Sequence, residues 1–308
     1  MQEAWGLRER MDQVGRVAVR PYMPEQHREL FEKLPTLWLG TLDDHGQPWA
    51  TVLTGARGFV ASPDPQSLRV SAQLAPDDPA AAGLHPGAAV GLLGLEPHTR
   101  RRNRMNGRIS AADAEGFAVR VIQSYGNCPK YIQAREPMVQ MDRARGPAAA
   151  EGATLSAAAR SLVEGADTLF IASSSAAHVD ASGRGGAGVD VSHRGGPSGF
   201  VQLRSTADGD VLTLPDYFGN SMFNTLGNLL AWPRAGLLFI DWQTGDVLQL
   251  AVKAVIRPIT GELPTASPVT RHWLDLHIEH GWWRPAAVPL RWSAAQPAAQ
   301  FAVPASAA

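Results

Sequence analysis

The spacing of apolar residues in the first part of the chain predicts one helix followed by short strands. Leu30, Phe31 and Leu34 fall on one face of a helix over residues 25–34, and Pro35 ends that pattern. Short apolar runs then alternate with polar turns, which is typical of antiparallel strands and hairpins. The expected strands span residues 36–42, 48–54, 68–71, 88–95 and 102–109.

The second part of the chain shows the same sequence of patterns. Residues 156–164 predict a helix whose buried stripe includes Ala159 and Leu162, with Gly165 after its last turn. A loop rich in Ser, Gly and Ala at 174–188 is expected at the surface, between the first two strands. The expected strands span residues 168–173, 189–194, 211–214, 235–241 and 246–256.

The two parts also match in sequence. The segment LVEGADTLFIAS, which begins at Leu162, aligns without gaps with LFEKLPTLWLGT, which begins at Leu30. After insertions, the Gly-Phe-Val at Gly58 is matched at Gly199, and a Gly-Leu-Leu at residue 91 is matched at 236. An internal repeat of this length predicts two similar domains packed as a pseudo-dimer, and sites in such assemblies tend to lie between the domains.

These patterns predict a mainly β protein with short helices (α+β class), built as two small barrels. Barrel closure removes the exposed strand edges that hairpin-rich sheets otherwise present. The chain lacks a Gly-rich dinucleotide fingerprint between a strand and a crossover helix. The expected domains are an N-terminal helical lead-in (1–33), a first barrel (34–140), a linker and helix (141–165), a second barrel (166–262), and a C-terminal helix and tail (263–308).

Composition narrows the function classes. The chain has 308 residues, of which 44% are hydrophobic and 19% are charged, and its formal net charge is −1. This charge gives no general attraction to nucleic acid or to anionic membranes. The N-terminus is charged and no apolar run approaches the ~20 residues of a membrane span, so we expect a cytoplasmic protein with a small-molecule substrate or electron donor. A homodimer is compatible with this composition. The single Cys128 excludes a disulfide within the chain.

One segment of the second part predicts an anion site. Met222, Phe223 and Leu226 have helical spacing, which places Asn220 and Ser221 at a helix N-terminus, where free backbone N–H groups favour phosphate. Two side chains on one face of the neighbouring strand complete the candidate site: Ser192 and Arg194. From spacing alone, the simpler interpretation is that the polar residues only cap the helix and that the arginine is a solvated charge.

A basic run in the first part has three interpretations. On a strand, Arg100, Arg102 and Arg104 point to the same side. They can hold an anion at the domain interface, contact nucleic acid, or prevent pairing at a sheet edge. Nucleic acid is the least favoured, because the net charge is −1 and no aromatic residues are interleaved with the run.

Several longer motifs resemble a known family. In the second part these are DVSHRGG from Asp190, LPDYFGN from Leu214 and FNTLGN from Phe223. In the first part they are TRRRNR from Thr99 and QSYGNCPKYIQ from Gln123. Together with the order of elements, these motifs are similar to the flavin-nucleotide-binding split-barrel proteins related to pyridoxamine 5′-phosphate oxidase, in the branch with two tandem barrels.

The resemblance implies two tandem split β-barrels that form an intrachain pseudo-dimer and bind FMN at their interface. It implies a flavin-binding protein, expected to be an FMN-dependent oxidoreductase, in which FMN carries the chemistry and the protein orients it. No residue is assigned a catalytic role. The cofactor-binding residues that the resemblance favours are Ser192, Arg194, Asn220, Ser221, Asn224, Arg102 and Arg104.

The alternative is a non-catalytic carrier of flavin or haem with the same fold. His272, His277 and His280 raise the haem interpretation, since the last two would share a face of a C-terminal helix. Ordinary surface histidines on an amphipathic helix explain the same pattern. Cys128 is either a redox thiol near the flavin or a small buried side chain, and the second interpretation is favoured for a lone cysteine.

Overall fold

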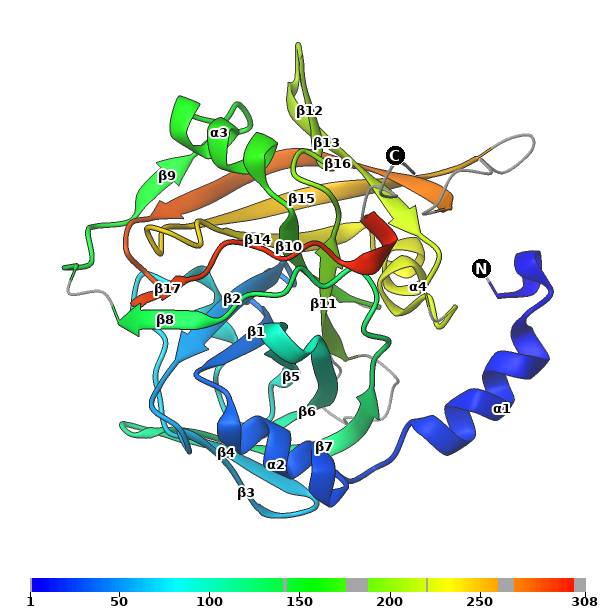
Figure 1. Ribbon diagram of the computed structural model, residues 1–308, viewed down its shortest axis with the longest axis vertical. Coiled ribbons are helices and arrows are strands. Elements are labelled where there is room, and N and C mark those ends of the chain that lie inside the picture. Colours follow the sequence, from blue (N-terminus) through cyan, green and yellow to red (C-terminus); the bar gives the residue numbers. More distant parts are fainter. Residues whose placement is uncertain (1, 141–142, 176–187, 220, 260–268, 302–308) are drawn as a thin grey trace, which may run out of the picture.

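The computed structural model describes residues 2–140, 143–175, 188–219, 221–259 and 269–301 (Figure 1). The chain is mainly β, with antiparallel sheets and short helices, as expected, and this architecture is consistent with a split-barrel fold. Among the described residues, no helix has the length and apolar character needed to cross a membrane.

The first 33 residues are helical and lead into the first sheet. They contain η1 (Glu3–Trp5), α1 (Arg8–Ala18) and α2 (Glu25–Lys33). Helix α2 follows Pro24 and buries Leu30 and Phe31 against the first sheet, as the apolar spacing predicted. Figure 1 shows α1 as an arm that runs beside the molecule, whereas α2 lies against the sheet.

The first sheet has seven strands in the order β2-β1-β5-β6-β7-β4-β3. Its strands are β1 (Thr36–Leu42), β2 (Pro48–Thr54), β3 (Val60–Asp64), β4 (Ser67–Val70), β5 (Ala89–Glu96), β6 (Arg101–Asp113) and β7 (Gly116–Gly126). Short 3-10 helices interrupt it at η2 (Pro79–Gly83) and η3 (Pro97–Thr99). All five strands expected in this part are present, and β3 and β7 are two further strands that the pattern analysis missed.

The second sheet has eight strands, with seven in the order β11-β10-β14-β15-β16-β13-β12 and β9 paired to β16. The strands are β9 (Ala149–Glu151), β10 (Thr168–Ser174), β11 (Val189–Gly195), β12 (Gln202–Thr206), β13 (Gly209–Tyr217), β14 (Arg234–Ile240), β15 (Val247–Pro258) and β16 (Thr270–Arg284). Helices α3 (Ala157–Gly165) and α4 (Asn224–Ala231) accompany it, and Ser156 caps α3 by accepting from the backbone N–H of Ala159.

The two seven-strand paths follow the same order when strands are matched in chain sequence, β1 with β10 through β7 with β16. Each sheet encloses its own apolar core, and a third apolar cluster joins the sheets. At its centre, the rings of Trp38 from β1 and Phe170 from β10 stack with centroids 3.6 Å apart and planes 9° apart. Figure 1 shows the first sheet below the second, with β1 and β2 of the first sheet near β10 and β11 of the second.

Two glycines permit this close approach. A Cβ at Gly91 on β5 would lie 2.6 Å from the carbonyl oxygen of Val189 on β11. A Cβ at Gly236 on β14 would lie still closer to the carbonyl oxygen of Pro48 on β2. The backbones of the two sheets therefore touch at both places, and only glycine leaves enough room there.

Two expectations need correction. The expected C-terminal helix is wrong: residues 270–284 form β16, a long strand in the second sheet, followed by β17 (Leu290–Trp292) and η4 (Ala299–Phe301). Strand β17 pairs with β8 (Pro137–Gln140), so the C-terminal segment returns to the end of the first half. The expected linker contributes β9 to the second sheet. Of the expected loop at 174–188, residues 176–187 lie outside the described residues.

Candidate anion-binding pocket between the sheets

A pocket opens where β6 and the segment after β7 meet β11, β13 and the start of α4. Six of the seven candidate residues line it. They are three arginines and three small polar residues: Arg102, Arg104, Arg194, Ser192, Ser221 and Asn224. The seventh, Asn220, lies outside the described residues. Residues from the first and the second half of the chain are thus brought to one site.

Arg104 crosses from the first sheet to the second at the floor of the pocket. Its guanidinium donates to Asp190 Oδ2 at 2.6 Å and also to Ser192 Oγ. The Ser192 hydroxyl lies 2.8 Å from Thr225 Oγ1 on α4. Burial raises the pKa of Asp190, although the nearby Arg104 counteracts that effect. The charge of Arg104 is therefore paired with the Asp190 carboxylate, and its guanidinium positions the Ser192 hydroxyl.

Arg194 is not a solvated edge charge, because it forms an ion pair inside the pocket. Its Nη1 donates to Asp216 Oδ1 at 2.7 Å, and His272 Nδ1 lies 3.5 Å from Asp216 Oδ2. Burial alone would raise the pKa of Asp216, but Arg194 and His272 outweigh it and hold that pKa below its usual value. The Nε of Arg194 is buried and has no hydrogen-bond partner among the described residues.

Arg102 forms no ion pair with a carboxylate among the described residues. Its Nε donates to the carbonyl oxygen of Cys128 at 2.9 Å, and its Nη1 lies 3.2 Å from His193 Nδ1. Burial, followed by the positive charges of Arg104 and Arg194, lowers the pKa of Arg102. Burial, followed by the positive charges of Arg102, Arg194 and Arg135, lowers the pKa of His193, so its ring is neutral and Nδ1 accepts from Arg102.

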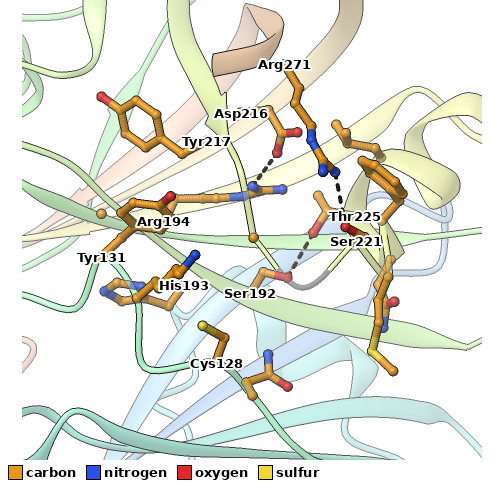
Figure 2. A pocket seen from close by; sticks show the side chains of 18 of the residues that line it. Cys128, Tyr131, Ser192, His193, Arg194, Asp216, Tyr217, Ser221, Thr225 and Arg271 are labelled. Carbon is orange, nitrogen blue, oxygen red and sulfur yellow. Dashed lines mark hydrogen bonds and ion pairs between the residues drawn. The ribbon is translucent and has the colours of Figure 1, made fainter. Parts of the chain in front are cut away.

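Arg271 is a pocket residue that the sequence analysis missed. It lies on β16, only 3% of it is exposed, and its Nη1 donates to Ser221 Oγ at 3.2 Å. Its guanidinium lies 3.7 Å from the ring centroid of Phe218, and its buried Nε has no partner within the described chain. Figure 2 shows Arg271 and Arg194 directed toward one region of the pocket, beside Ser192, Thr225 and Ser221.

The helix at this site begins later than expected. Helix α4 starts at Asn224, and both Ser221 and Phe223 have left-handed backbone angles, with φ of 61° and 57°. Ser221 therefore lies in the irregular segment before the helix and does not cap it. Asn224, in the first turn, donates to the hydroxyl of Tyr125 at 2.6 Å, which ties α4 to the first sheet.

An aromatic wall forms the other side of the pocket. The ring of Tyr131 lies 5.2 Å from Tyr217 and 5.6 Å from Phe301. The Tyr131 hydroxyl donates to the carbonyl oxygen of Phe218 at 2.7 Å, and burial raises the pKa of Tyr131 to about 12, so it stays protonated. These tilted rings offer an apolar aromatic surface to a ligand.

The pocket has an excess of positive charge. Its lining contains five cationic side chains and one carboxylate: Arg102, Arg104, Lys130, Arg194, Arg271 and Asp216. A second carboxylate, Asp190, pairs with Arg104 from outside the lining. Both carboxylates already pair with arginines, which leaves the other cations without a carboxylate among the described residues. Buried unpaired cations are costly, so this arrangement favours an anionic ligand.

The histidines behind the haem interpretation do not share a helical face, because all three lie on β16. His272 is buried beside Asp216, whereas His277 is exposed and His280 packs its ring 5.6 Å from Trp49. Among the described residues, no group of three or more His, Cys, Asp or Glu side chains has a geometry that could hold a metal ion. Cys128 is a half-buried free thiol in the pocket lining.

Comparison with known proteins supports the resemblance of the first half. The sequence profile of a family described as Pyridoxamine 5′-phosphate oxidase matches residues 23–144. This match confirms the family resemblance. It covers α2 and the whole first sheet, and it ends before the second.

Two further comparisons add less. No curated protein sequence matches the chain. Among solved structures, the crystal structure of HutZ, the heme storage protein from Vibrio cholerae, aligns at 14% sequence identity with a TM-score of 0.26. The alignment covers 42% of this chain and 93% of HutZ. A TM-score this low establishes no common fold for the whole chain.

Proposed function

We propose that the chain binds FMN in the pocket between the sheets and acts as an FMN-dependent oxidoreductase on a small molecule. The phosphate of FMN would lie against Ser192, Arg194, Ser221 and Arg271, and the ring would face the aromatic wall formed by Tyr131 and Tyr217. The family resemblance supplies the identity of the cofactor, and the unpaired cations of the pocket supply the physical reason for a phosphate.

The observation that carries this proposal is the pair of buried guanidinium groups with unused donors. The Nε atoms of Arg194 and Arg271 are buried and lack hydrogen-bond partners among the described residues. A buried donor that loses water without gaining a partner costs about 1–3 kcal/mol, so two such donors on side chains that line one pocket favour a ligand that accepts from these guanidinium groups. A phosphate presents acceptor oxygens in several directions and fits beside the hydroxyls of Ser192 and Ser221.

We further propose that the two halves are tandem split barrels paired as a pseudo-dimer within one chain. Three observations support this: the identical strand order of the two sheets, the stacking of Trp38 on Phe170, and the matched contacts of Gly91 and Gly236. The pocket then lies at a junction between barrels, where the first half supplies Arg102 and Arg104 and the second half supplies the phosphate end.

Bound FMN would supply the hydride or electron transfer itself. The residues of the chain would orient it: Arg104 holds the Ser192 hydroxyl in place, and the protonated Tyr131 keeps the wall beside the ring apolar. The alternative is a carrier that binds flavin or haem without turnover. We favour the flavin enzyme because the unpaired cations suit a phosphate. The haem interpretation relied on His277 and His280 sharing a helical face, and both lie on strand β16 instead.

The test is an absorption spectrum of the protein after incubation with excess FMN or haemin and removal of unbound cofactor. We expect retained flavin bands with FMN, and an affinity for FMN about ten- to a hundredfold higher than for riboflavin, which lacks the phosphate. Retention of haem without flavin, or equal affinities for FMN and riboflavin, would contradict the proposal. Oxidation of a reduced nicotinamide by the FMN-loaded protein would separate enzyme from carrier.

A further inference from the structure

The pocket has a counterpart at the other junction of the two sheets. Within the hairpins, Leu39 pairs with Thr51 and Ile171 pairs with Ser192, so Thr51 on β2 holds the position of Ser192 on β11. This equivalence uses the alignment of Leu39 with Ile171, the residues that follow the stacked Trp38 and Phe170 by one position.

The same matching applies to the strands that reach across. Leu93 pairs with Arg104, and Leu238 pairs with Gln249, so Gln249 on β15 holds the position of Arg104 on β6. The first junction, with Ser192, Arg104 and Thr225, is called the open corner below. The second junction, with Thr51, Gln249, Asp78 and Arg284, is called the closed corner.

In the closed corner, the carboxylate of Asp78 accepts from three side chains. It accepts from the Thr51 hydroxyl at 2.6 Å, the Gln249 amide at 3.0 Å and the Arg284 guanidinium at 2.6 Å. It also accepts from the backbone N–H of Ala80 at 3.0 Å. Thr51 and Gln249 have no exposed surface, and the Asp78 side chain is 1% exposed.

The arginine of the closed corner comes from a different strand. Arg284 is the last residue of β16, where it pairs with Val247 of β15, and it also donates to the Gln249 side chain at 3.3 Å. Its Nη2 lies 3.6 Å from Asp77 Oδ1. A hydroxyl, an amide and a guanidinium thus converge on one anion, as hydroxyls and guanidiniums converge in the open corner.

We propose that the closed corner is a latent phosphate site in which the carboxylate of Asp78 takes the place of the phosphate group. This inference rests on the proposed binding of a phosphate at the open corner. In the closed corner Arg284 lies beside two carboxylates, Asp77 and Asp78, whereas the open corner has more cations than carboxylates. A ligand phosphate would therefore meet excess negative charge in a buried space, and the closed corner excludes it. The chain therefore binds one FMN, and removal of the Asp78 carboxylate creates a site for inorganic phosphate.

The test compares thermal unfolding of Asp78→Ala and the unaltered protein in sodium phosphate and in sodium chloride of equal ionic strength. Both proteins keep the open corner, so the difference between them reports on the closed corner alone. We expect phosphate to raise the Tm of Asp78→Ala by about 2–4 °C more than that of the unaltered protein. An equal response of the two proteins would overturn the proposal.

Two further variants make the test specific. Asp78→Asn keeps the shape of the side chain and fills the corner, so phosphate should give it no extra stabilisation. Asp210→Ala removes an equally buried carboxylate, 1% exposed and paired with Arg160, away from the interface. An extra phosphate response in either variant equal to that of Asp78→Ala would show that the effect is unspecific and would overturn the proposal.

If Asp78→Ala is recovered only as insoluble protein, its refolding yield in phosphate and in chloride replaces the thermal measurement. A higher yield in phosphate, absent for Asp210→Ala, supports a phosphate site, and equal yields contradict it. A titration of the unaltered protein with FMN runs in parallel. Failure of that titration counts against the open corner, whereas failure of the phosphate response counts against the closed corner.

Discussion

The open and closed corners occupy matching positions in the fold, yet they differ in the balance of positive and negative side chains. Both have a hydroxyl on the hairpin strand, Ser192 or Thr51, and both have a polar residue reaching across, Arg104 or Gln249. Both corners contain a buried carboxylate, but in the closed corner two carboxylates, Asp77 and Asp78, lie beside the single arginine Arg284. The open corner has a surplus of cations around a pocket.

This difference shows that the scaffold and the site are separable. The scaffold requires glycine at 91 and 236 and aromatic rings at 38 and 170, and these features occur in both halves. The site depends on a few positions at which the two halves differ. For example, Trp49 in the first half matches Asp190 in the second. We therefore expect the closed corner to contribute to stability and the open corner to be available for a ligand.

The largest expected effect comes from emptying the closed corner. Asp78→Ala leaves the buried Arg284 without its closest carboxylate, and the loss of one partner of a buried ion pair typically costs about 3–5 kcal/mol. Urea unfolding should show this decrease in the free energy of unfolding. FMN affinity of the folded protein should be unchanged, and a large loss of affinity would contradict the separation of the two corners.

The next effect concerns ligand affinity in the open corner. Arg194→Ala and Arg271→Ala should each weaken FMN binding about ten- to a hundredfold, because each removes a charge-assisted hydrogen bond worth about 1.5–3 kcal/mol. Cys128→Ala, in the same pocket lining, should leave the affinity nearly unchanged. Flavin fluorescence titrations of the three variants measure this. A loss confined to Cys128→Ala would place the flavin beside the 127–131 loop instead.

The two glycine contacts should be equally sensitive, because the scaffold is alike in both halves. Gly91→Ala and Gly236→Ala place a Cβ against the backbones of Val189 and Pro48, and overpacking of this kind typically costs about 1–3 kcal/mol. Gly15→Ala, where a Cβ meets nothing within 4 Å, is the matched control. A marked cost at only one of the two interface glycines, measured by urea unfolding, would argue against paired halves.

The last effect is gradual: stability should depend on pH because two histidines are buried in the neutral form. Burial, then Arg20 and Arg101, lowers the pKa of His27 to about 4, and the pKa of His193 also lies well below its usual value. Between pH 6.5 and 4 the unfolded chain binds protons that the folded chain does not. Stability should therefore fall as the pH falls, by up to about 1.4 kcal/mol per pH unit for each histidine.

The substitutions His27→Gln and His193→Gln should each remove part of this slope, whereas substitution of the exposed His277 should not. FMN should reduce the contribution of His193 alone, because a phosphate near Arg102 and Arg194 offsets the positive charges that keep this ring neutral. Denaturant titrations from pH 4 to pH 7 check this expectation. An equal influence of FMN on both histidines would contradict the placement of the phosphate.

The strand pattern and the main candidate residues could be predicted from the sequence because they depend on local order. Period-2 apolar runs and polar turns located most strands of both sheets. The motif around Ser192 and Arg194 and the arginine row at 102 and 104 lie on strands whose directions follow from alternation. That these residues meet in one pocket depends on how the two halves pack. The sequence indicates this only through the internal repeat, which predicts a pseudo-dimer with a site between the domains.

The misses have specific causes. The sequence of the C-terminal segment (263–308) predicts a helix because Trp273, Leu276 and Ile278 suggest an amphipathic face, and this interpretation does not single out Arg271. The alternation of Leu274, Leu276 and Ile278 with polar residues was the available signal for a strand. Asp78 could not be recognised from sequence, since nothing local shows that a residue before a 3-10 helix meets β15 and β16 of the other sheet.

The central claim is that one corner holds a cofactor and the other holds an internal anion. An equilibrium titration of the unaltered chain with FMN, followed by flavin fluorescence and by the amount of flavin retained, counts the sites directly. We predict saturation at about one FMN per chain, with Arg194→Ala weakening that single site. Two equivalent sites per chain, or saturable binding that survives Arg194→Ala and Arg271→Ala unchanged, would contradict the account.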